Sequence, residues 1–339
     1  MNVCVHSVRF TVSLFLPVSG ALCGLIIKIC FLFLLLKKID RLLVAVRPRV
    51  IIMLYDTSLL MQCQVKKYSG LNFARKIRSV TPDISSRIWY CGTSIGLTYD
   101  GLIASANFCR NRFCPICQWR RSVKLFRQNY ECFQWIKAQY PGCRFVFLTL
   151  TVRNVPIDLL ATRLADMSAA WNRFTQRRDF KALGLPGWLR VLEVTRNAQT
   201  GTYHPHYHVV LVVQSGCWLP DHSWWLRCWQ LAARDDSIMF VNLRVLDGSK
   251  SSIEEVSKYV VKDSDFSGSD WVSDFPKLYS TLCHVRCFSP AGCWRDARRV
   301  FGFVDPDTDS LTDDVSTGGK IMDFVYLYNF KLFACIGFH

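Results

Sequence analysis

Two histidines with the spacing of metal ligands lie in the middle of the chain. His206 and His208 belong to the apolar stretch HPHYHVVLVV at 204–213. Alternate residues of a β-strand point to the same face, so a strand over 206–213 carries both imidazoles on one side. Imidazole nitrogen is a common ligand of divalent metal ions. The spacing predicts half of a metal site, and the alternative is two partly exposed histidines on a hairpin.

A carboxylate joins this predicted site if the preceding strand pairs with it. A hairpin between strands at 189–195 and 206–213, turning near Gln199 and Thr200, sets Glu193 directly opposite His206. Directly opposed residues share a face of a sheet. The prediction depends on the register, because a slip of one residue would send Glu193 to the other face.

A charged segment farther along the chain offers a nucleophile. In EEVSKYVVK at 254–262, Glu255, Tyr259 and Lys262 have the spacing of residues on one face of a helix. A phenol has a pKa of about 10 in water, so a tyrosine nucleophile at neutral pH needs a cation beside it. Lys262 and the histidine-bound ion would supply that cation, whereas the same pattern also describes an ordinary solvated helix face.

Cysteines gather in a short stretch upstream of these residues. Cys109, Cys114 and Cys117 form a C-x4-C-x2-C run, and Cys91 is the nearest candidate for a fourth ligand. Cysteine thiolates in such a set are typical of a structural Zn²⁺ site. The chain contains 16 cysteines in all, so plain packing of the thiols is the alternative.

The charge of the chain favours a polyanionic partner. It carries 42 Lys and Arg against 26 Asp and Glu, a formal net charge of +16, although the stretch after residue 304 is acidic. Nucleic acid is the first candidate. Basic side chains in and after the cysteine run predict a surface that contacts DNA phosphates, with a solvated basic face as the alternative: Arg110, Arg112, Arg120, Arg121 and Lys124.

The elements that must position these residues predict an α+β fold. FVFLTLTV at 145–152 is typical of a strand, and 157–178 has the apolar spacing of an amphipathic helix. The strands that carry Glu193 and the histidines follow. A strand, a helix and then a strand pair is an α+β order, which we expect to form an antiparallel sheet with flanking helices. Further helices are expected at 123–140, 224–233 and 253–262, and a further strand at 239–245.

Four stretches of the chain, in this order, resemble the HUH-type rolling-circle replication initiators of small bacterial plasmids, in their single-tyrosine class. They are NFCRNRFCPICQWRRS at 107–122, FLTLTV at 147–152, HPHYHVV at 204–210 and EVSKYVVK at 255–262. The resemblance covers roughly residues 87–300. It implies the HUH-type antiparallel sheet with flanking helices.

The resemblance also implies roles for individual residues. His206 and His208 would bind Mg²⁺ or Mn²⁺ near the scissile phosphate, Tyr259 would take the 5′ phosphate, and Glu255 would activate the water that ends the cycle. Glu193 as third ligand rests on the hairpin geometry and on related HUH folds, and His204 would support the site from outside the ligand set.

The implied activity is nicking of one strand at a plasmid or phage origin, which starts rolling-circle replication. The implied partners are origin DNA, single-stranded or as a hairpin, the host helicase and polymerase, and further copies of the chain. A relaxase or single-tyrosine transposase would use the same residues on a different DNA. A zinc-containing DNA-binding regulator without catalysis would explain the cysteine block but leave Tyr259 and the two later histidines without a role.

The first 54 residues differ in composition from the rest. Residues 10–27 contain no charge and 29–36 continue the apolar run, which is long enough for a transmembrane helix. A membrane anchor, a signal peptide and translated sequence upstream of a start at Met53 or Met61 are the three interpretations, and we favour the third.

We therefore expect four parts and a bacterial cytoplasmic protein, with membrane association through residues 10–36 as the alternative. The parts are an apolar segment at 1–54, a cysteine-rich basic DNA-binding region at 55–140, an HUH endonuclease domain at 141–304, and an acidic and then apolar tail at 305–339.

Overall fold

The computed structural model describes most of the chain beyond residue 56. The described residues are 57–98, 102–246, 253, 257, 268–313, 324–328 and 333–337. They belong to one compact unit, Leu54–His339. Glu255, Tyr259, Lys262 and the apolar segment at 1–54 lie outside the described residues. No helix among the described residues is long and apolar enough to cross a membrane.

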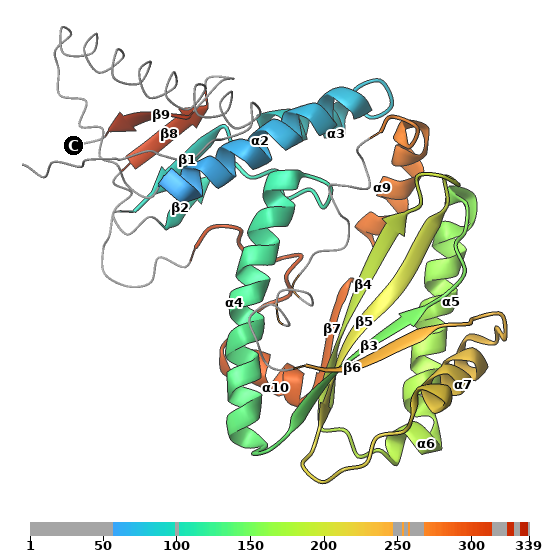
Figure 1. Ribbon diagram of the computed structural model, residues 1–339. Helices are drawn as coiled ribbons and strands as arrows, with labels where there is room; N and C mark the ends of the chain where they lie inside the picture. The colour runs from blue at the N-terminus through green and yellow to red at the C-terminus, as the bar shows by residue number, and fades with distance from the viewer. Residues whose placement is uncertain are drawn as a thin grey trace, which may run out of the picture. The chain divides into compact units, whose positions relative to one another are not determined.

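A five-stranded antiparallel sheet lies at the centre of the fold (Figure 1). Its strand order is β6-β3-β5-β4-β7, so the strands that carry the histidines and Glu193 are inner strands. The expected α+β class with an antiparallel sheet is confirmed. The strands are β3 (Arg144–Thr151), β4 (Gly187–Arg196), β5 (Tyr203–Val213), β6 (Val241–Leu246) and β7 (Phe288–Gly292).

The hairpin between β4 and β5 has the predicted register. Glu193 pairs with His206, and the pairing runs without interruption from Gly187 to Arg196. The side chain of Asn197 closes the turn by accepting hydrogen bonds from the backbone N–H groups of residues 199 and 200, at 2.9 and 3.3 Å. Gly201 completes the turn with φ +68°, a conformation that glycine adopts without strain. Both strands are longer than predicted because their polar ends also pair.

The edge strand β7 was not predicted from the sequence. It contains Pro290, which has no N–H to donate and is therefore found in edge strands rather than inner ones. It lies very close to β4, because a Cβ on Gly187 would come within 2.4 Å of the carbonyl oxygen of Ala291. The glycine is what lets the two backbones approach at this point.

Helices cover both faces of the sheet (Figure 1). On one face Trp171 of α5 meets Tyr207 of β5 edge to face, with ring centroids 6.1 Å apart. On the other face Phe133 of α4 stacks on Phe145 of β3, at 3.7 Å. The first face carries α5 (Ile157–Gln176), α6 (Arg178–Lys181) and α7 (His222–Ala233), and the second carries α4 (Pro115–Gln139) and α10 (Cys293–Val300).

Two of the predicted helices begin earlier than expected. α7 begins at His222 because the side chain of Asp221 accepts a hydrogen bond from the backbone N–H of Trp224, at 2.9 Å, and so caps the first turn. α4 begins at Pro115, inside the cysteine run, where proline suits the first helical turn. The predicted strand at 239–245 is observed two residues later, as β6.

A second sheet and the helices near it were not predicted. Its strand order is β2-β1-β8-β9, which pairs β1 with a strand more than two hundred residues away in sequence. These strands have four or five residues each, too few for a clear alternating pattern. The elements are α2 (Thr57–Ile77), α3 (Pro82–Tyr90), β1 (Ser94–Leu97), β2 (Ile103–Ala106), β8 (Phe324–Tyr328) and β9 (Phe333–Gly337), and η2 (Val272–Asp274) and α9 (Phe275–Cys283) were likewise missed.

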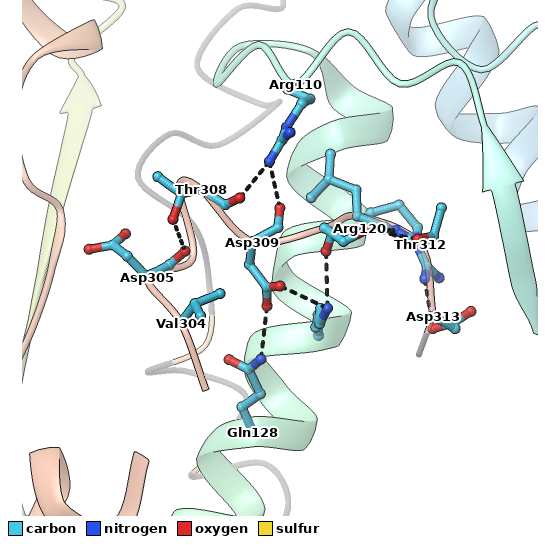
Figure 2. A network of polar contacts seen from close by, with 12 residues as sticks. Arg110, Arg120, Gln128, Val304, Asp305, Thr308, Asp309, Thr312 and Asp313 are labelled. Carbon is cyan, nitrogen blue, oxygen red and sulfur yellow. Dashed lines mark hydrogen bonds and ion pairs between the residues drawn. The ribbon is translucent and has the colours of Figure 1, made fainter. Parts of the chain in front are cut away.

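The acidic segment, residues 305–313, lies along the basic side of α4 (Figure 2). Arg110 donates to the backbone carbonyl oxygens of Thr308 and Asp309, at 2.6 and 2.9 Å. Gln128 donates to the carboxylate of Asp309, at 3.0 Å. Three ion pairs join the two parts: Arg112–Asp307 at 2.6 Å, Arg120–Asp313 at 2.8 Å and Lys124–Asp309 at 3.1 Å.

The expected open DNA-binding surface on this helix is therefore covered. Arg120 and Arg121 are each 3% exposed, and Arg121 donates to the backbone carbonyl oxygen of Asn111, at 3.3 Å. The sequence separates the acidic segment from the cysteine block by almost two hundred residues, but folding brings them together at high effective concentration. Contact of these cations with DNA phosphates stays a prediction, and it requires the acidic segment to leave α4.

We predict that Asp313→Asn lowers the free energy of unfolding by about 3 kcal/mol, because it leaves the buried Arg120 guanidinium without its counter-charge. The asparagine keeps an oxygen that accepts from the backbone N–H of Ile103, as the carboxylate does at 2.8 Å. Urea unfolding followed by circular dichroism measures the change. The matched control is Asp236→Asn, which breaks an exposed ion pair with Arg227 and should cost less than about 0.5 kcal/mol. Equal costs for the two variants would contradict a stabilising role for the acidic segment.

Candidate active site

Glu193, His206 and His208 come together on one face of the five-stranded sheet. Oε2 of Glu193 lies 3.3 Å from Nε2 of His206 and 2.8 Å from Nε2 of His208. The three side chains come from two paired strands, so the sheet itself fixes their spacing. Glu193 is 5% exposed and His206 is 8% exposed, which places the group largely out of solvent. We call these three residues the metal triad.

Both imidazoles of the metal triad are oriented through their other ring nitrogen. Nδ1 of His206 lies 3.2 Å from the backbone carbonyl oxygen of His204, and Nδ1 of His208 lies 3.3 Å from Oγ1 of Thr149. A carbonyl oxygen can only accept, so Nδ1 of His206 carries a proton and Nε2 is the nitrogen that faces the centre. This is the tautomer that binds a metal ion.

The donor set of the metal triad fits a divalent cation. One carboxylate oxygen and two imidazole nitrogens lie within 4.8 Å of one another. Lone pairs that converge in this way repel one another unless a proton or a cation lies between them. A nitrogen and oxygen set of three leaves coordination positions open for water or a phosphate oxygen, as a catalytic metal site requires.

Two residues that the sequence analysis missed complete this face of the sheet. Thr149 and Phe147 alternate along β3, and they pair with His208 and with residue 210 of β5. The ring of Phe147 stacks on the ring of His208 with centroids 5.1 Å apart, and the guanidinium of Arg244 lies 4.9 Å from the centre of the Phe147 ring. The alternation in FLTLTV, which places Phe147 and Thr149 on one face, was a signal for both residues, but the pairing of this strand with the histidine strand was not predicted.

His204 contributes through its backbone. The sequence analysis expected it to support the site, and its carbonyl oxygen, rather than its ring, accepts from His206. Burial, and then the neighbouring His206, lower the pKa of the His204 imidazole below its ordinary value. The ring of His204 lies 5.1 Å from the ring of His206. At this distance a charged His204 would repel a cation held by the metal triad, and the lowered pKa favours the uncharged form of His204.

Two residues of the predicted helix at 253–262, which carries Tyr259, belong to the described part of the chain. Ile253 and Ser257 are helical and each is 2% exposed. Ser257 Oγ donates to the backbone carbonyl oxygen of Ile253, at 2.8 Å, and accepts from Nδ2 of Asn129 on α4, at 3.1 Å. This turn is thus anchored to the helix that covers the metal-triad face of the sheet. The roles of Glu255, Tyr259 and Lys262 stay predictions.

The four cysteines expected to act as ligands converge at the start of α4. Sγ of Cys117 lies 3.5 Å from Sγ of Cys91 and 3.7 Å from Sγ of Cys109. All four sulfur atoms, including that of Cys114, lie within 4.8 Å of one another. A tetrahedral zinc ion with Zn–S bonds of about 2.3 Å separates its sulfur ligands by roughly 3.8 Å. The cluster could therefore hold a metal ion.

A buried lysine, which the sequence analysis missed, lies beside the cysteine cluster. Lys67 of α2 is 0% exposed and donates to the backbone carbonyl oxygens of Trp89 and Cys91, at 2.6 and 2.7 Å. Burial lowers its pKa, and the nearby thiols oppose this effect. Burial raises the pKa of the Cys114 thiol, whereas hydrogen bonds from Cys114 and Cys117 lower the pKa of Cys109. An ammonium group next to several thiolates offsets part of their negative charge.

Comparison with known proteins places the chain in a family. Residues 101–322 match the family Rep_1, described as Replication protein. "Protein rep" of Streptococcus pneumoniae serotype 2 is 32% identical over 235 residues, which cover 64% of this chain and 72% of that protein. "Protein rep" of Bacillus amyloliquefaciens is 33% identical over 190 residues, 50% of this chain and 56% of the relative.

A more distant relative aligns over more of its length. "Protein rep" of Lentilactobacillus hilgardii is 28% identical over 269 residues, which cover 74% of this chain and 85% of that protein. No solved structure matches significantly. The family match covers more than half of the chain and confirms the resemblance to plasmid replication initiators. The chain belongs to the Rep_1 family of replication proteins.

Proposed function

We propose that this chain initiates plasmid replication by nicking one DNA strand in a metal-dependent reaction. Membership of a replication protein family supports the role of initiator. The observation that carries the nicking reaction is the metal triad, in which a carboxylate and two oriented imidazoles converge on one point of an inner strand pair. A role limited to DNA binding would leave this centre without an explanation.

Tyr259 is the proposed nucleophile. Its phenolate oxygen attacks phosphorus at the nick site, and the bond from phosphorus to the 3′ oxygen breaks. The phenol loses its proton and the departing 3′ oxygen gains one, so the products are a 5′ phosphotyrosine link and a free 3′ hydroxyl. Lys262 would stabilise the phenolate, and Glu255 would take the proton of the water that later releases the strand.

Glu193, His206 and His208 would hold Mg²⁺ or Mn²⁺ at the scissile phosphate. The bound ion supplies charge stabilisation to the phosphate oxygens. The chain's own contribution is positional: the β4–β5 register fixes the three ligands, and the carbonyl oxygen of His204 and the hydroxyl of Thr149 fix the two rings.

The proposed partners follow from this reaction. Origin DNA, single-stranded or as a hairpin, would be the substrate, and the free 3′ hydroxyl would serve the host polymerase behind a host helicase. Self-association and a cytoplasmic site of action belong to the same proposal. The reaction cleaves and rejoins strands, so the activity is that of a site-specific endonuclease and strand transferase.

We also propose that Cys91, Cys109, Cys114 and Cys117 bind a structural zinc ion. Sulfur atoms separated by 3.5 and 3.7 Å support a tetrahedral site of this kind, as does the buried ammonium of Lys67 beside them. The ion would fix the start of α4 against the chain at residues 91 and 109.

For the cysteine cluster, we expect the purified protein to carry about one zinc ion per chain. Replacing Cys114 and Cys117 together by serine should remove it and lower the melting temperature, because two of four ligands are lost. Elemental analysis measures the zinc. The control is Cys143→Ser, a partly exposed cysteine outside the cluster, which should retain the ion. Freshly prepared, reduced wild-type protein without zinc would refute the assignment.

For the metal triad, we expect His206→Ala and His208→Ala each to reduce cleavage of an origin oligonucleotide at least about a hundredfold. DNA affinity should stay nearly unchanged, because it depends mainly on phosphate contacts elsewhere. Gel analysis of the cleaved strand with Mg²⁺ or Mn²⁺ measures the effect. His284→Ala, an exposed histidine, is the control. A triad variant that cleaves normally would show that its histidine is not a ligand.

A further prediction separates Tyr259 from Glu255. Tyr259→Phe removes only the hydroxyl, so the covalent adduct between protein and DNA should disappear while folding and binding persist. Glu255→Gln removes a base without removing bulk, so the adduct should still form but its hydrolytic release should fail.

An origin oligonucleotide labelled on both sides of the nick distinguishes these steps. The 5′-side label follows the strand that cleavage frees with its 3′ hydroxyl, and the 3′-side label follows the adduct and, after hydrolysis, the same strand free of protein. Equal loss of both steps in Glu255→Gln would make that residue part of the metal site or of the fold. An adduct that persists in Tyr259→Phe would assign the nucleophile to another residue.

A further inference from the structure

A second basic surface, formed by α10 and the edge of the five-stranded sheet, is open to solvent. We call it the arginine hollow. It is a shallow depression of about 390 Å³ whose lining includes Arg286, Phe288, Arg295, Arg298, Arg299 and Phe303. It differs from the basic side of α4, which the acidic segment covers, although the first two residues of that segment, Asp305 and Pro306, also line the hollow.

The arginine hollow lies on the same face of the sheet as the metal triad. Phe288 of β7 pairs with Val191 of β4, and the backbone N–H of Leu192 donates to the carbonyl oxygen of Cys287, at 2.8 Å. The contact between the two strands therefore continues to Leu192 and Cys287, the neighbours in sequence of Glu193 and Arg286. Val191 pairs with His208 on its other side, and opposed residues share a face, so Phe288 lies on the face of the metal triad. The edge of the hollow is one strand away from a proposed metal ligand.

The hollow keeps a surplus of positive charge. Its acidic neighbours are Asp296, which lies 3.5 Å from Arg299, and Asp305, which lies 3.6 Å from Arg286. The arginine side chains in these two pairs are 75% and 68% exposed, so each pair is weak and is screened by water. Arg295 forms no ion pair with a described residue. A phosphate can therefore approach these guanidinium groups without displacing a buried partner.

The floor of the hollow is rigid. Arg298 is 5% exposed, and both of its terminal nitrogens donate to Oε1 of Gln128 on α4, at 3.2 Å. Its guanidinium also lies 4.8 Å over the ring of Phe288 and 5.6 Å over the ring of Phe303. These contacts tie α10 to α4 and to β7. The exposed arginines consequently project from a fixed base rather than from a loop.

An exposed aromatic pair borders the hollow. Phe301 is 40% exposed and stacks on Phe303, with ring centroids 5.4 Å apart. Aromatic rings beside basic groups are the usual means of binding unpaired bases, because every base has a face that can stack. Duplex DNA does not offer such a face. The combination of arginines and an exposed ring therefore fits a single strand better than a duplex.

We propose that the arginine hollow binds the backbone of a single DNA strand that leads into the metal triad. The guanidinium groups of Arg286, Arg295 and Arg299 contact successive phosphates, and Phe301 stacks on a base. The proposal rests on the proposed function for its direction, since the strand runs toward the centre that would cut it. Binding itself needs neither the metal ion nor cleavage.

The test is the affinity of the full chain for a labelled single-stranded oligodeoxynucleotide of mixed sequence, measured by fluorescence anisotropy with EDTA at several salt concentrations. We expect the double variant Arg295→Gln with Arg299→Gln to bind at least about fivefold more weakly. The slope of log affinity against log salt should fall by about 0.7 for each phosphate that the variant no longer neutralises. The control pair, Arg178→Gln with Arg227→Gln, alters exposed arginines of α6 and α7 on the opposite face and should leave both quantities unchanged.

Two further measurements specify the partner. Arg295→Lys with Arg299→Lys keeps the charge and should retain most of the affinity, and Phe301→Ala should weaken single-strand binding but not duplex binding. Wild-type affinity and salt slope in the glutamine double variant, with an unchanged melting temperature, would overturn the proposal. Equal losses for duplex and single strand, with no effect of Phe301→Ala, would overturn the assignment to a single strand.

Failure of the proposed function gives a different result. A wild-type chain that forms no adduct with origin DNA, while the glutamine double variant still loses affinity in EDTA, would refute the nicking reaction and support the hollow as a binding surface. A wild-type chain that forms the adduct, with unchanged affinity in the double variant, would support the nicking reaction and refute the hollow as a binding surface.

Discussion

The antiparallel register of β4 and β5 is the constraint on which the candidate site depends. It sets Glu193 opposite His206 and leaves His208 on the same face, so two paired strands bring the three side chains together without a loop. A shift of one residue would turn the carboxylate to the face covered by α5. The turn at Asn197, closed by its own side chain and by Gly201, prevents that shift. Local turn chemistry thus fixes the geometry of the site.

Much of this centre could be predicted from the sequence because its contacts are local or periodic. The hairpin that places Glu193 spans few residues, and the alternation along β5 identifies His206 and His208. What could not be predicted depends on contacts between distant segments. Lys67 reaches the cysteine cluster from another helix, and β1 pairs with β8 across most of the chain. Local patterns carry no information on such pairings.

The same limit explains why the basic residues differ from expectation. Along the sequence, the arginines after Cys109 form an unopposed cluster. In the structure Asp307, Asp309 and Asp313 lie against them, and Arg120 is buried. Net charge therefore indicates a polyanionic partner without locating its surface. The surface for that partner is located instead by the cations that are exposed and form only weak ion pairs. In the described part of the chain these cations lie at α10 rather than on α4.

α4 connects these parts mechanically. Its first turn carries Cys117 of the cysteine cluster, and Gln128 contacts both Asp309 of the acidic segment and Arg298 in the floor of the arginine hollow. The next residue, Asn129, holds the turn at Ser257, two residues before the proposed nucleophile. A metal ion that fixes the start of this helix would therefore also restrain the hollow and Ser257 relative to the sheet. Because the metal triad is built on that sheet, α4 connects the cysteine cluster to the candidate active site through the contacts of Gln128 and Asn129.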